Sequence, residues 1–476
     1  MNASVLMIAL PLLAAFLLPL TGPLARWVGP FAAALNIALG ISLWQTVAQE
    51  GPSVVVMGGF AAPLGIVFRV DTLAVLFATA LAALVLILWP RTSADPRRES
   101  ALLLILLAAG CGLAFSGDLF NLFVFYELIA VASYGLVAAS RERLAAAAGL
   151  RYLVLSALGS AFALLGIGLV YALAGTLNLA DLSRHADALN SPLGLAAFAL
   201  MLLGFGVKAE LFPVNAWVAE VYSTATARTT ALLAGGVSKL ALLIVLHLVL
   251  LVYAQPAALS LLLTLGLLSI VSGQFAGYRA ADLPRMLAYS SIAQLGMIAA
   301  AFSVSGEAGV LAGLALALHH LIVKPALFLV GDGWPKCVDS LAGLGRAEPW
   351  RAALFVLLAL SLLGIPPLPG FWAKLLLLKA LLGMGEPAWN LAAAVVLLGT
   401  AIEGAYLLRV LQTLFRGTTN AKPATFGGAL PAGVLGVALL LVMLAATPVG
   451  GALQRAAQQA ADVPAYVADT LGGSPQ

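Results

Sequence analysis

The sequence predicts an all-α polytopic membrane protein with about 14 transmembrane helices. The chain has 476 residues, of which 62% are hydrophobic, and its mean hydropathy is +1.06. Only 9% of the residues are charged, whereas a soluble protein carries about 25%. Apolar runs of about 20 residues, each long enough for one membrane-spanning helix, follow one another along the chain. This composition excludes a soluble enzyme, a secreted disulfide scaffold and a disordered protein.

The predicted spans are apolar runs that clusters of arginine, proline or glycine separate. They lie near residues 3–21, 29–48, 70–90, 100–116, 118–139, 148–175, 194–222, 229–252, 257–277, 284–305, 307–331, 350–382, 388–415 and 425–447. Because no basic residue precedes Arg26, we expect the first run to be a retained helix and not a cleaved signal peptide.

The seventh and twelfth runs are too long for simple spans and contain proline near their middle. These prolines are Pro213 in the seventh run and Pro366, Pro367 and Pro369 in the twelfth. Proline removes a helix hydrogen bond, so we predict a broken helix in each run. Irregular backbone within a membrane must be surrounded by protein or line a cavity.

Two broken helices five spans apart indicate an internal repeat of spans 4–8 and 9–13. The odd number of spans in each copy turns the second copy upside down relative to the first. We therefore predict four parts: an N-terminal three-helix segment at 1–99, two half-channels at 100–252 and 253–415, and a last helix with a short tail at 416–476.

Basic residues concentrate in the loops, and at the helix edges, that follow odd-numbered spans. They are Arg26, Arg91, Arg97, Arg98, Arg141, Arg143, Arg151, Arg228, Arg279, Arg285, Lys336, Arg346, Arg351, Arg416 and Lys422. Arg69, Arg184 and Arg455 lie on the other side. The positive-inside rule then predicts a protein of the cytoplasmic membrane with both termini on the outer side.

Cofactor chemistry has no visible support in the sequence. Cys111 and Cys337 are too few for an iron–sulfur cluster or a structural zinc site, and neither a nucleotide-binding loop nor a metal-ligand spacing is present. We expect no cofactor and no bound metal. The chain shows no redox chemistry of its own, and whether it belongs to a redox enzyme complex stays open.

Charges inside the predicted spans are the most informative feature of the sequence. Five of the seven lysines lie there, together with one of the 17 arginines: Lys208, Lys239, Lys324, Lys374, Lys379 and Arg409. Each charge costs about 3 kcal/mol at mid-bilayer on insertion scales. A buried lysine can release its proton near neutral pH, whereas arginine stays charged. We favour a proton-transfer role for four of the lysines and leave Lys379 between function and snorkelling.

Acidic partners are fewer. Glu127 lies within the fifth predicted span, where its carboxylate needs a cation such as Lys208. Glu210 follows Lys208 by two residues and either takes part in transfer or satisfies backbone at the break. Glu403 is either an exit-path carboxylate or a partner of Arg409.

Histidines extend this set. His320 and Lys324 are four residues apart and share a helix face, so a proton can pass between them through water. His319 points about 100° away and is expected to pack. His247 follows Lys239 by two helical turns and either extends the relay or is a buried histidine.

Six motifs together resemble the antiporter-like proton-translocating subunits shared by Mrp cation/proton antiporters, respiratory complex I and membrane-bound hydrogenases. They occur in the family's order and cover about residues 100–415. The matching segments are 118–136, VKAELFPVNAW at 207–217, AGGVSK at 234–239, MLAYSSIAQLG at 286–296, HLIVKPALF at 320–328 and GIPPLPGFWAK at 364–374.

The resemblance implies a proton path along the membrane midplane. It makes Glu127 and Lys208 a modulating pair and Lys239 the central relay. His320 and Lys324 would continue the relay, and Lys374 would be the terminal proton-exchanging group.

The sequence departs from the family pattern at two places. After Trp217 the family shows a Pro-Asp pair and an Ala-Pro-Thr-Pro run, where this chain has Val218-Ala-Glu220 and ATART at 225–229. Glu210 occupies a position where the family usually has a small residue. The length and the N-terminal part most resemble the D-type subunit of Mrp antiporters.

Three functions compete at this point. The first is a proton-translocating subunit of a cation/proton antiporter, or of an NADH:quinone oxidoreductase or hydrogenase complex, with other integral membrane subunits as partners and sodium or potassium as counter-ion. The second is a proton-driven energy-coupling subunit for another transporter. The third is a self-contained solute transporter, which the series of lysines argues against. Nothing suggests nucleic-acid binding.

Overall fold

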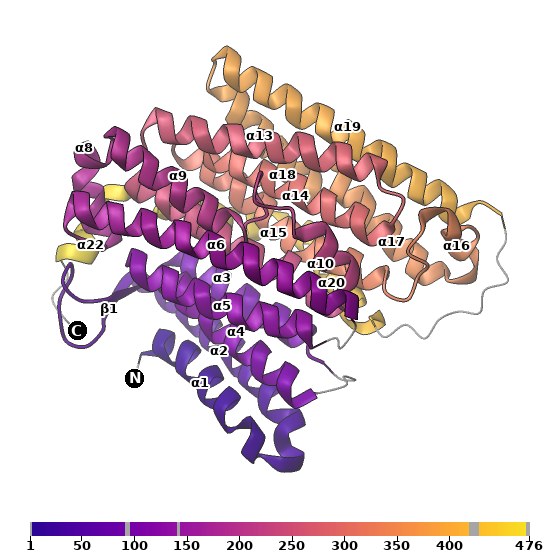
Figure 1. Cartoon of the computed structure of the whole chain (residues 1–476), viewed down its shortest axis with the longest axis horizontal. Coiled ribbons are helices and arrows are strands. Elements are labelled where there is room, and N and C mark those ends of the chain that lie inside the picture. The colour runs from indigo at the N-terminus through magenta and orange to yellow at the C-terminus, as the bar shows by residue number, and fades with distance from the viewer. Residues whose placement is uncertain (1, 91–95, 140–142, 418–427, 473–476) are drawn as a thin grey trace. The chain divides into compact units, whose positions relative to one another are not determined.

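The computed structural model describes residues 2–90, 96–139, 143–417 and 428–472. Within these residues the chain is almost entirely helical (Figure 1). It divides into two compact units, of which unit 1 comprises Met1–Ala209, Lys239–Leu261 and Gln454–Gln476. Unit 2 comprises Glu210–Ser238 and Leu262–Leu453. Three basic residues of the predicted loops, Arg91, Arg141 and Lys422, lie outside the described residues.

Unit 1 contains the N-terminal helices, the family-like motif at 118–136 and the lysines Lys208 and Lys239 of the next two motifs. Its elements are α1 (Ala3–Leu17), η1 (Leu18–Leu20), η2 (Gly22–Leu24), α2 (Ala25–Glu50), β1 (Ser53–Val56), β2 (Val67–Val70), α3 (Thr72–Ile87), α4 (Pro96–Phe115), α5 (Leu119–Ala138), α6 (Arg143–Ala174), α7 (Leu179–Leu182), η3 (Ser183–His185), α8 (Ala186–Leu189), α9 (Pro192–Gly206), α12 (Ser238–His247), η5 (Leu248–Val252) and α22 (Val463–Gly472). The strands form an antiparallel hairpin with Ser53 opposite Val70, which the sequence did not predict.

Unit 2 contains the second half of the motifs. Its elements are α10 (Val218–Thr224), α11 (Ala227–Leu232), η4 (Leu233–Val237), α14 (Leu283–Phe302), α15 (Glu307–Val330), η6 (Val338–Leu341), α16 (Leu344–Ala347), α17 (Pro349–Leu363), α18 (Pro369–Gly383), α19 (Pro387–Phe415) and α20 (Ala429–Leu444). The chain passes between the units within α13 (Pro256–Arg279) and α21 (Ala446–Ala461).

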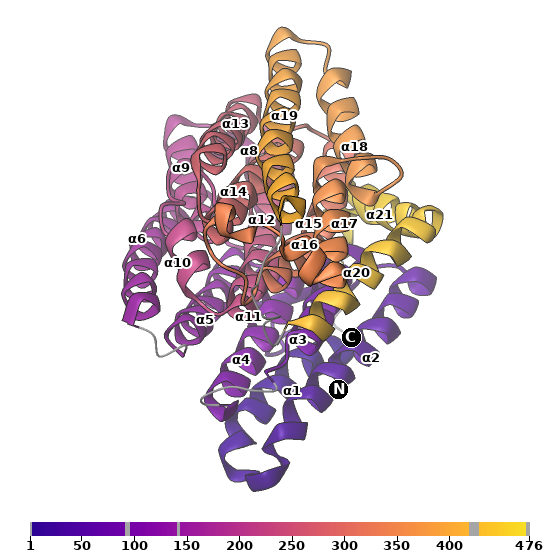
Figure 2. The same ribbon diagram turned by 90° about the vertical axis from the view of Figure 1, so that its right-hand side faces the viewer.

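Two glycines allow α6 and α9 of unit 1 to approach closely. The helices lie side by side in both views (Figures 1 and 2). A Cβ atom added to Gly204 would lie 2.5 Å from the carbonyl oxygen of Gly159, so only glycine fits there. This approach brings the polar face of α6 close to the C-terminal end of α9.

Helix α15 is the centre of unit 2. It packs against α14, α17, α18 and α20, as Figure 2 shows for the last three. All but a few of its residues are buried. Such an all-round apolar helix is stable only when neighbouring helices enclose it.

The predicted helix breaks are confirmed. In the seventh predicted span α9 ends at Gly206 and α10 begins at Val218. In the twelfth span α17 ends at Leu363, where Gly364 has the left-handed conformation (φ 82°), and α18 begins at Pro369. The carbonyl groups at the end of each first half-helix therefore need partners from elsewhere in the fold.

The apolar helices are those of a multi-span membrane protein. In the described part of the chain, nine helical stretches are long and apolar enough to cross a bilayer. A tenth span results if α20 and α21, which bend by 86° at their junction, are taken together. The count of 14 crossings stays a prediction.

Candidate functional site

Four of the five lysines predicted within the membrane are buried. The exposed fractions are 1% for Lys208, 1% for Lys239, 0% for Lys324 and 7% for Lys374. Lys379 is exposed on α18, which agrees with a peripheral position. The predicted burial is therefore confirmed for four of the five lysines.

Lys208 lies just beyond the end of α9, among residues of unit 1. Its Nζ atom donates a hydrogen bond of 2.7 Å to the hydroxyl of Ser156 on α6. It also lies 3.6 Å from the ring centroid of Tyr126 on α5, a favourable cation–π distance. The Tyr126 hydroxyl donates to the Gly204 carbonyl at 2.9 Å, so the ring is fixed against the end of α9.

Glu127 is held by a second serine of the same helix. The Ser160 hydroxyl donates to Glu127 Oε1 at 2.5 Å, and Ser160 lies one turn after Ser156 on α6. The carboxylate is only half-buried. Each charge is bound to its own serine, and the structure shows no direct ion pair between Glu127 and Lys208. We call Glu127, Ser160, Ser156 and Lys208 the first cluster.

Lys374 bridges the break between α17 and α18. Its Nζ atom lies 3.3 Å from Glu403 Oε2 on α19 and 3.5 Å from the carbonyl oxygen of Leu363 at the end of α17. A cation at this place is favourable because the C-terminal end of a helix carries partial negative charge. Lys208 has the corresponding position just after α9.

Glu403 is fully buried and accepts two further hydrogen bonds from α14. The donors are Ser290 Oγ at 2.6 Å and Gln294 Nε2 at 2.8 Å. The sequence offered Arg409 as an alternative partner of Glu403, and this pairing is wrong. Arg409 is exposed and donates to the carbonyl groups of Tyr278 and Ala280.

Ser290 connects Glu403 to a second lysine. Lys324 Nζ on α15 donates to Ser290 Oγ at 2.6 Å and to the Leu287 carbonyl at 3.1 Å. A hydroxyl that accepts from a lysine and donates to a carboxylate is a continuous hydrogen-bonded link. We call Lys324, Ser290, Glu403 and Lys374 the second cluster.

The histidines occupy different surroundings. His320 is buried on α15, four residues before Lys324, as predicted. His319 does more than pack, because its Nε2 atom lies 2.9 Å from the Ser361 hydroxyl on α17. His247 is buried at the end of α12.

The remaining predicted residues lie at helix irregularities. Lys239 is the second residue of α12 and follows the π-helical segment η4. Glu210 is fully buried in the break after α9, and its Oε1 atom accepts a hydrogen bond from Tyr222 at 2.6 Å.

Sequence reasoning missed the polar residues that connect the charges. These are Ser156, Ser160, Ser290 and Gln294. A usable signal was present, because Ser156 and Ser160, like Ser290 and Gln294, are spaced four residues apart and therefore share a helix face.

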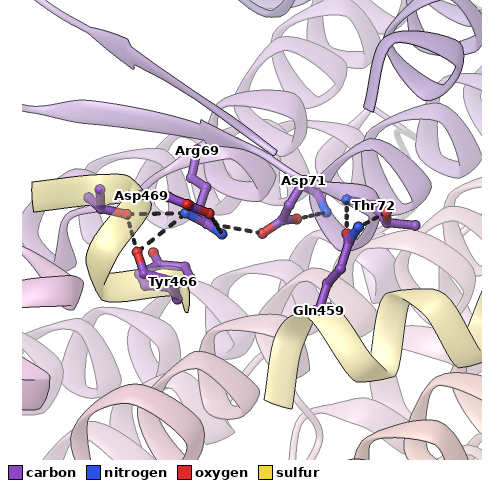
Figure 3. Close-up of polar contacts among 8 residues, drawn as sticks. Arg69, Asp71, Thr72, Gln459, Tyr466 and Asp469 are labelled. Atoms are coloured by element: carbon purple, nitrogen blue, oxygen red, sulfur yellow. Dashed lines mark hydrogen bonds and ion pairs between the residues drawn. The ribbon is translucent and has the colours of Figure 1, made fainter. Parts of the chain in front are cut away.

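Arg69 lies in the connection between α2 and α3, as predicted, but its burial was not foreseen. It is 4% exposed and forms ion pairs with Asp71 at 3.3 Å and Asp469 at 3.2 Å, and its guanidinium stacks on the Tyr466 ring (Figure 3). Burial raises the pKa of the Tyr466 phenol above its usual value, with Arg69 opposing the shift. These contacts fasten α22 to β2, far along the chain.

Metal ligation has no candidate in the described ranges, where no group of three or more histidine, cysteine or acidic residues could hold an ion. The hydrogen-bonded lysines and carboxylates are thus the chemistry that this part of the chain offers.

Residues 116–402, which include the first cluster and all of the second except Glu403, match the family described as "NADH:quinone oxidoreductase/Mrp antiporter, TM". The chain belongs to this family. The chain is 33% identical to NADH-quinone oxidoreductase subunit N of Desulforudis audaxviator strain MP104C, over 86% of each chain. It is 29% identical to the D subunit of the Na(+)/H(+) antiporter of Bacillus subtilis strain 168, over 89% of this chain and 88% of the relative.

Solved structures of this antiporter-like family are similar over nearly the whole length. A chain of the archaeal membrane-bound sulfane sulfur reductase matches with a TM-score of 0.91 and 29% identity, over 99% of this chain and 100% of that one. A chain of the Mrp complex from Dietzia sp. DQ12-45-1b matches with a TM-score of 0.89 and 26% identity, over 99% of each.

Proposed function

We propose that this chain translocates protons as one subunit of a multi-subunit membrane complex, where it serves as the D-like subunit of a Mrp-type monovalent cation/proton antiporter. The observation that carries this proposal is that each unit holds a buried lysine at a helix break, close to a carboxylate that accepts a hydrogen bond from a serine. Lys208 donates to Ser156, one turn from the Ser160–Glu127 pair, and Lys374 is paired with Glu403, which accepts from Ser290.

The chemistry follows from burial. A lysine out of contact with water pays a desolvation cost for its charge, so its proton is released more readily than in solution. A serine hydroxyl accepts a hydrogen bond and donates one at the same time, so it transmits a proton without carrying charge. An arginine in these positions would stay protonated and would block transfer.

The residues receive the roles that the family motifs imply. Glu127 modulates Lys208 in the first half-path, and Lys239 is the central relay. His320 and Lys324 continue the path, and Lys374 exchanges the proton at its end. Glu403 is the counter-charge of Lys374, and His247 is a secondary candidate on the path from Lys239.

The architecture proposed for this function has 14 crossings and two inverted repeats, spans 4–8 and 9–13. The broken helices α9–α10 and α17–α18 occupy equivalent places in the two copies. The corresponding parts of the chain are 1–99, 100–252, 253–415 and 416–476. We place the protein in the cytoplasmic membrane with both termini outside, with other integral membrane subunits as partners and sodium or potassium as counter-ion.

A second candidate is a proton-pumping subunit of an NADH:quinone oxidoreductase or a related respiratory complex. The 33% identity to an NADH-quinone oxidoreductase subunit N supports it, as does the match to the sulfane sulfur reductase. The two candidates share the same proton chemistry and differ in what drives it.

The test measures proton movement in vesicles that contain the assembled complex, with Lys208→Ala and Lys374→Ala as variants. Both should lose most of their proton transport. Lys379→Ala is the matched control, because Lys379 lies on the same helix as Lys374 but is exposed. Full transport by both buried-lysine variants would refute the proposal, and an imposed Na⁺ or K⁺ gradient separates antiport from redox-driven pumping.

A further inference from the structure

Glu210 has an unusual backbone conformation. Its φ angle is 58°, and it is the one residue other than glycine with positive φ in the described part of the chain. A side chain other than that of glycine is strained in this region. Such strain persists only when surrounding interactions hold the residue in place.

Aromatic packing fixes the side chain of Glu210. Its hydrogen-bond donor Tyr222 is buried and packs edge-on against Phe328 of α15, with ring centroids 5.5 Å apart. Phe328 lies one helical turn after Lys324, so both are on the same face of α15. The Glu210 carboxylate is therefore held near the face of α15 that carries Lys324.

The charge of Glu210 reaches Lys324 without a direct bond. The Lys324 ammonium donates to Ser290 and to the Leu287 carbonyl, and the negative charges that act on it are Glu403 and Glu210. Lys374 acts on it with the opposite sign. His320, one turn before Lys324 on α15, is a further titratable group on the same helix face.

The second cluster carries more lysines than carboxylates, which suggests a role for Glu210. The second cluster contains two lysines and one carboxylate, and Glu403 is already paired with Lys374 at 3.3 Å. An unbalanced charge in a low-dielectric interior is costly. Glu210 supplies a further buried carboxylate, held by Tyr222, which packs against the face of α15 that carries Lys324.

We infer that Glu210 is the second counter-charge of the second cluster and keeps the proton on Lys324 while Glu403 is engaged by Lys374. This inference rests on the proposed proton transfer. Glu210 acts here as a positioning residue that sets when Lys324 releases its proton. It also gives a function to a residue that departs from the family pattern.

The experiment compares the pH dependence of proton transport in the assembled complex for Glu210→Gln and Tyr222→Phe. The glutamine keeps an acceptor for Tyr222 but removes the charge, so the protonated form of Lys324 loses stabilisation. We expect the transport profile to move to lower pH by about one unit. Tyr222→Phe keeps the charge and should leave the profile within about 0.3 units of the parent while lowering thermal stability.

Glu210→Gly serves as a second variant because glycine tolerates the backbone angle. It should show the same acid shift as Glu210→Gln even if the glutamine variant assembles poorly. An unchanged pH profile in both Glu210 variants would overturn the inference. Lys208→Ala and Lys374→Ala measured in parallel separate the two claims, because full transport by both of these variants refutes the proposed function itself.

Discussion

The first and second clusters each contain buried lysine and a carboxylate, but the two charges are bound differently in each cluster. In the first, Lys208 and Glu127 are each bound to a serine of α6, at 2.7 and 2.5 Å, and do not meet. In the second, Lys374 and Glu403 form a direct ion pair at 3.3 Å. One serine, Ser290, then links this pair to Lys324.

The two carboxylates differ in their burial and in the number of side chains that bind them. Glu403 is fully buried and accepts from two α14 side chains besides its lysine. Glu127 is half-buried, with one serine donor. Disrupting a buried ion pair leaves an uncompensated charge, so the contacts of Glu403 are costly to break. The first cluster is therefore the place where charge rearranges at low cost, and the second is the place where charge is held.

The largest effect is expected for Glu403→Gln. The substitution leaves the Lys374 ammonium without its counter-charge and should destabilise the protein by about 3–5 kcal/mol. The apparent melting temperature of the purified complex measures this loss. Glu127→Gln should cost much less in the same assay while still reducing transport. Equal destabilisation by both substitutions would remove the distinction between the clusters.

Ser290→Ala should have the next largest effect. It removes the hydroxyl that connects Lys324 to Glu403 but leaves the Lys374–Glu403 pair in place. A lost hydrogen bond to a charged group costs about 1.5–3 kcal/mol, so we expect proton transport to fall by roughly tenfold or more. Ser291→Ala is the matched control, because the neighbouring serine lies on another face of α14. Parental transport by Ser290→Ala would show that protons bypass this hydroxyl.

Replacing both serines of the first cluster should have a smaller effect on stability. In Ser156→Ala, Lys208 keeps its contact with the Tyr126 ring, and in Ser160→Ala the half-buried Glu127 loses one hydrogen-bond donor. We expect about 1–2 kcal/mol for each, measured by thermal unfolding. A double variant whose cost exceeds the sum of the single costs would indicate that the two serines act as one unit.

The smallest effect is expected for Arg409→Gln. Arg409 is exposed and caps the carbonyl end of α13, so stability should change by less than about 0.5 kcal/mol. Transport should stay at the parental level in the vesicle assay. A strong transport defect would restore the pairing of Arg409 with Glu403 in the working protein.

The sequence sufficed for the charged residues because their cost in a membrane is independent of detailed packing. A buried lysine such as Lys324 is conspicuous in an apolar run, and proline marks both helix breaks. The serines were not found, because a serine such as Ser156 has a low free-energy cost in an apolar helix and therefore does not stand out in the sequence. Their partners depend on how closely α6 and α9 approach.

Long-range contacts explain the other misses. Arg69 precedes a predicted span and was assigned to a loop, yet its partner Asp469 comes from the far end of the chain. Likewise, the pairing of Glu403 with Lys374 and not with Arg409 depends on the break between α17 and α18. Spacing along one helix cannot predict contacts that three-dimensional packing creates.

The most direct test of the account replaces Lys208 and Lys374 singly by arginine. Arginine keeps the positive charge that the surrounding groups require but does not release its proton. We predict that both variants assemble and that their proton transport in vesicles falls by at least about tenfold. Parental transport by either arginine variant, in a complex of unchanged subunit composition, would contradict the claim that these lysines carry the proton.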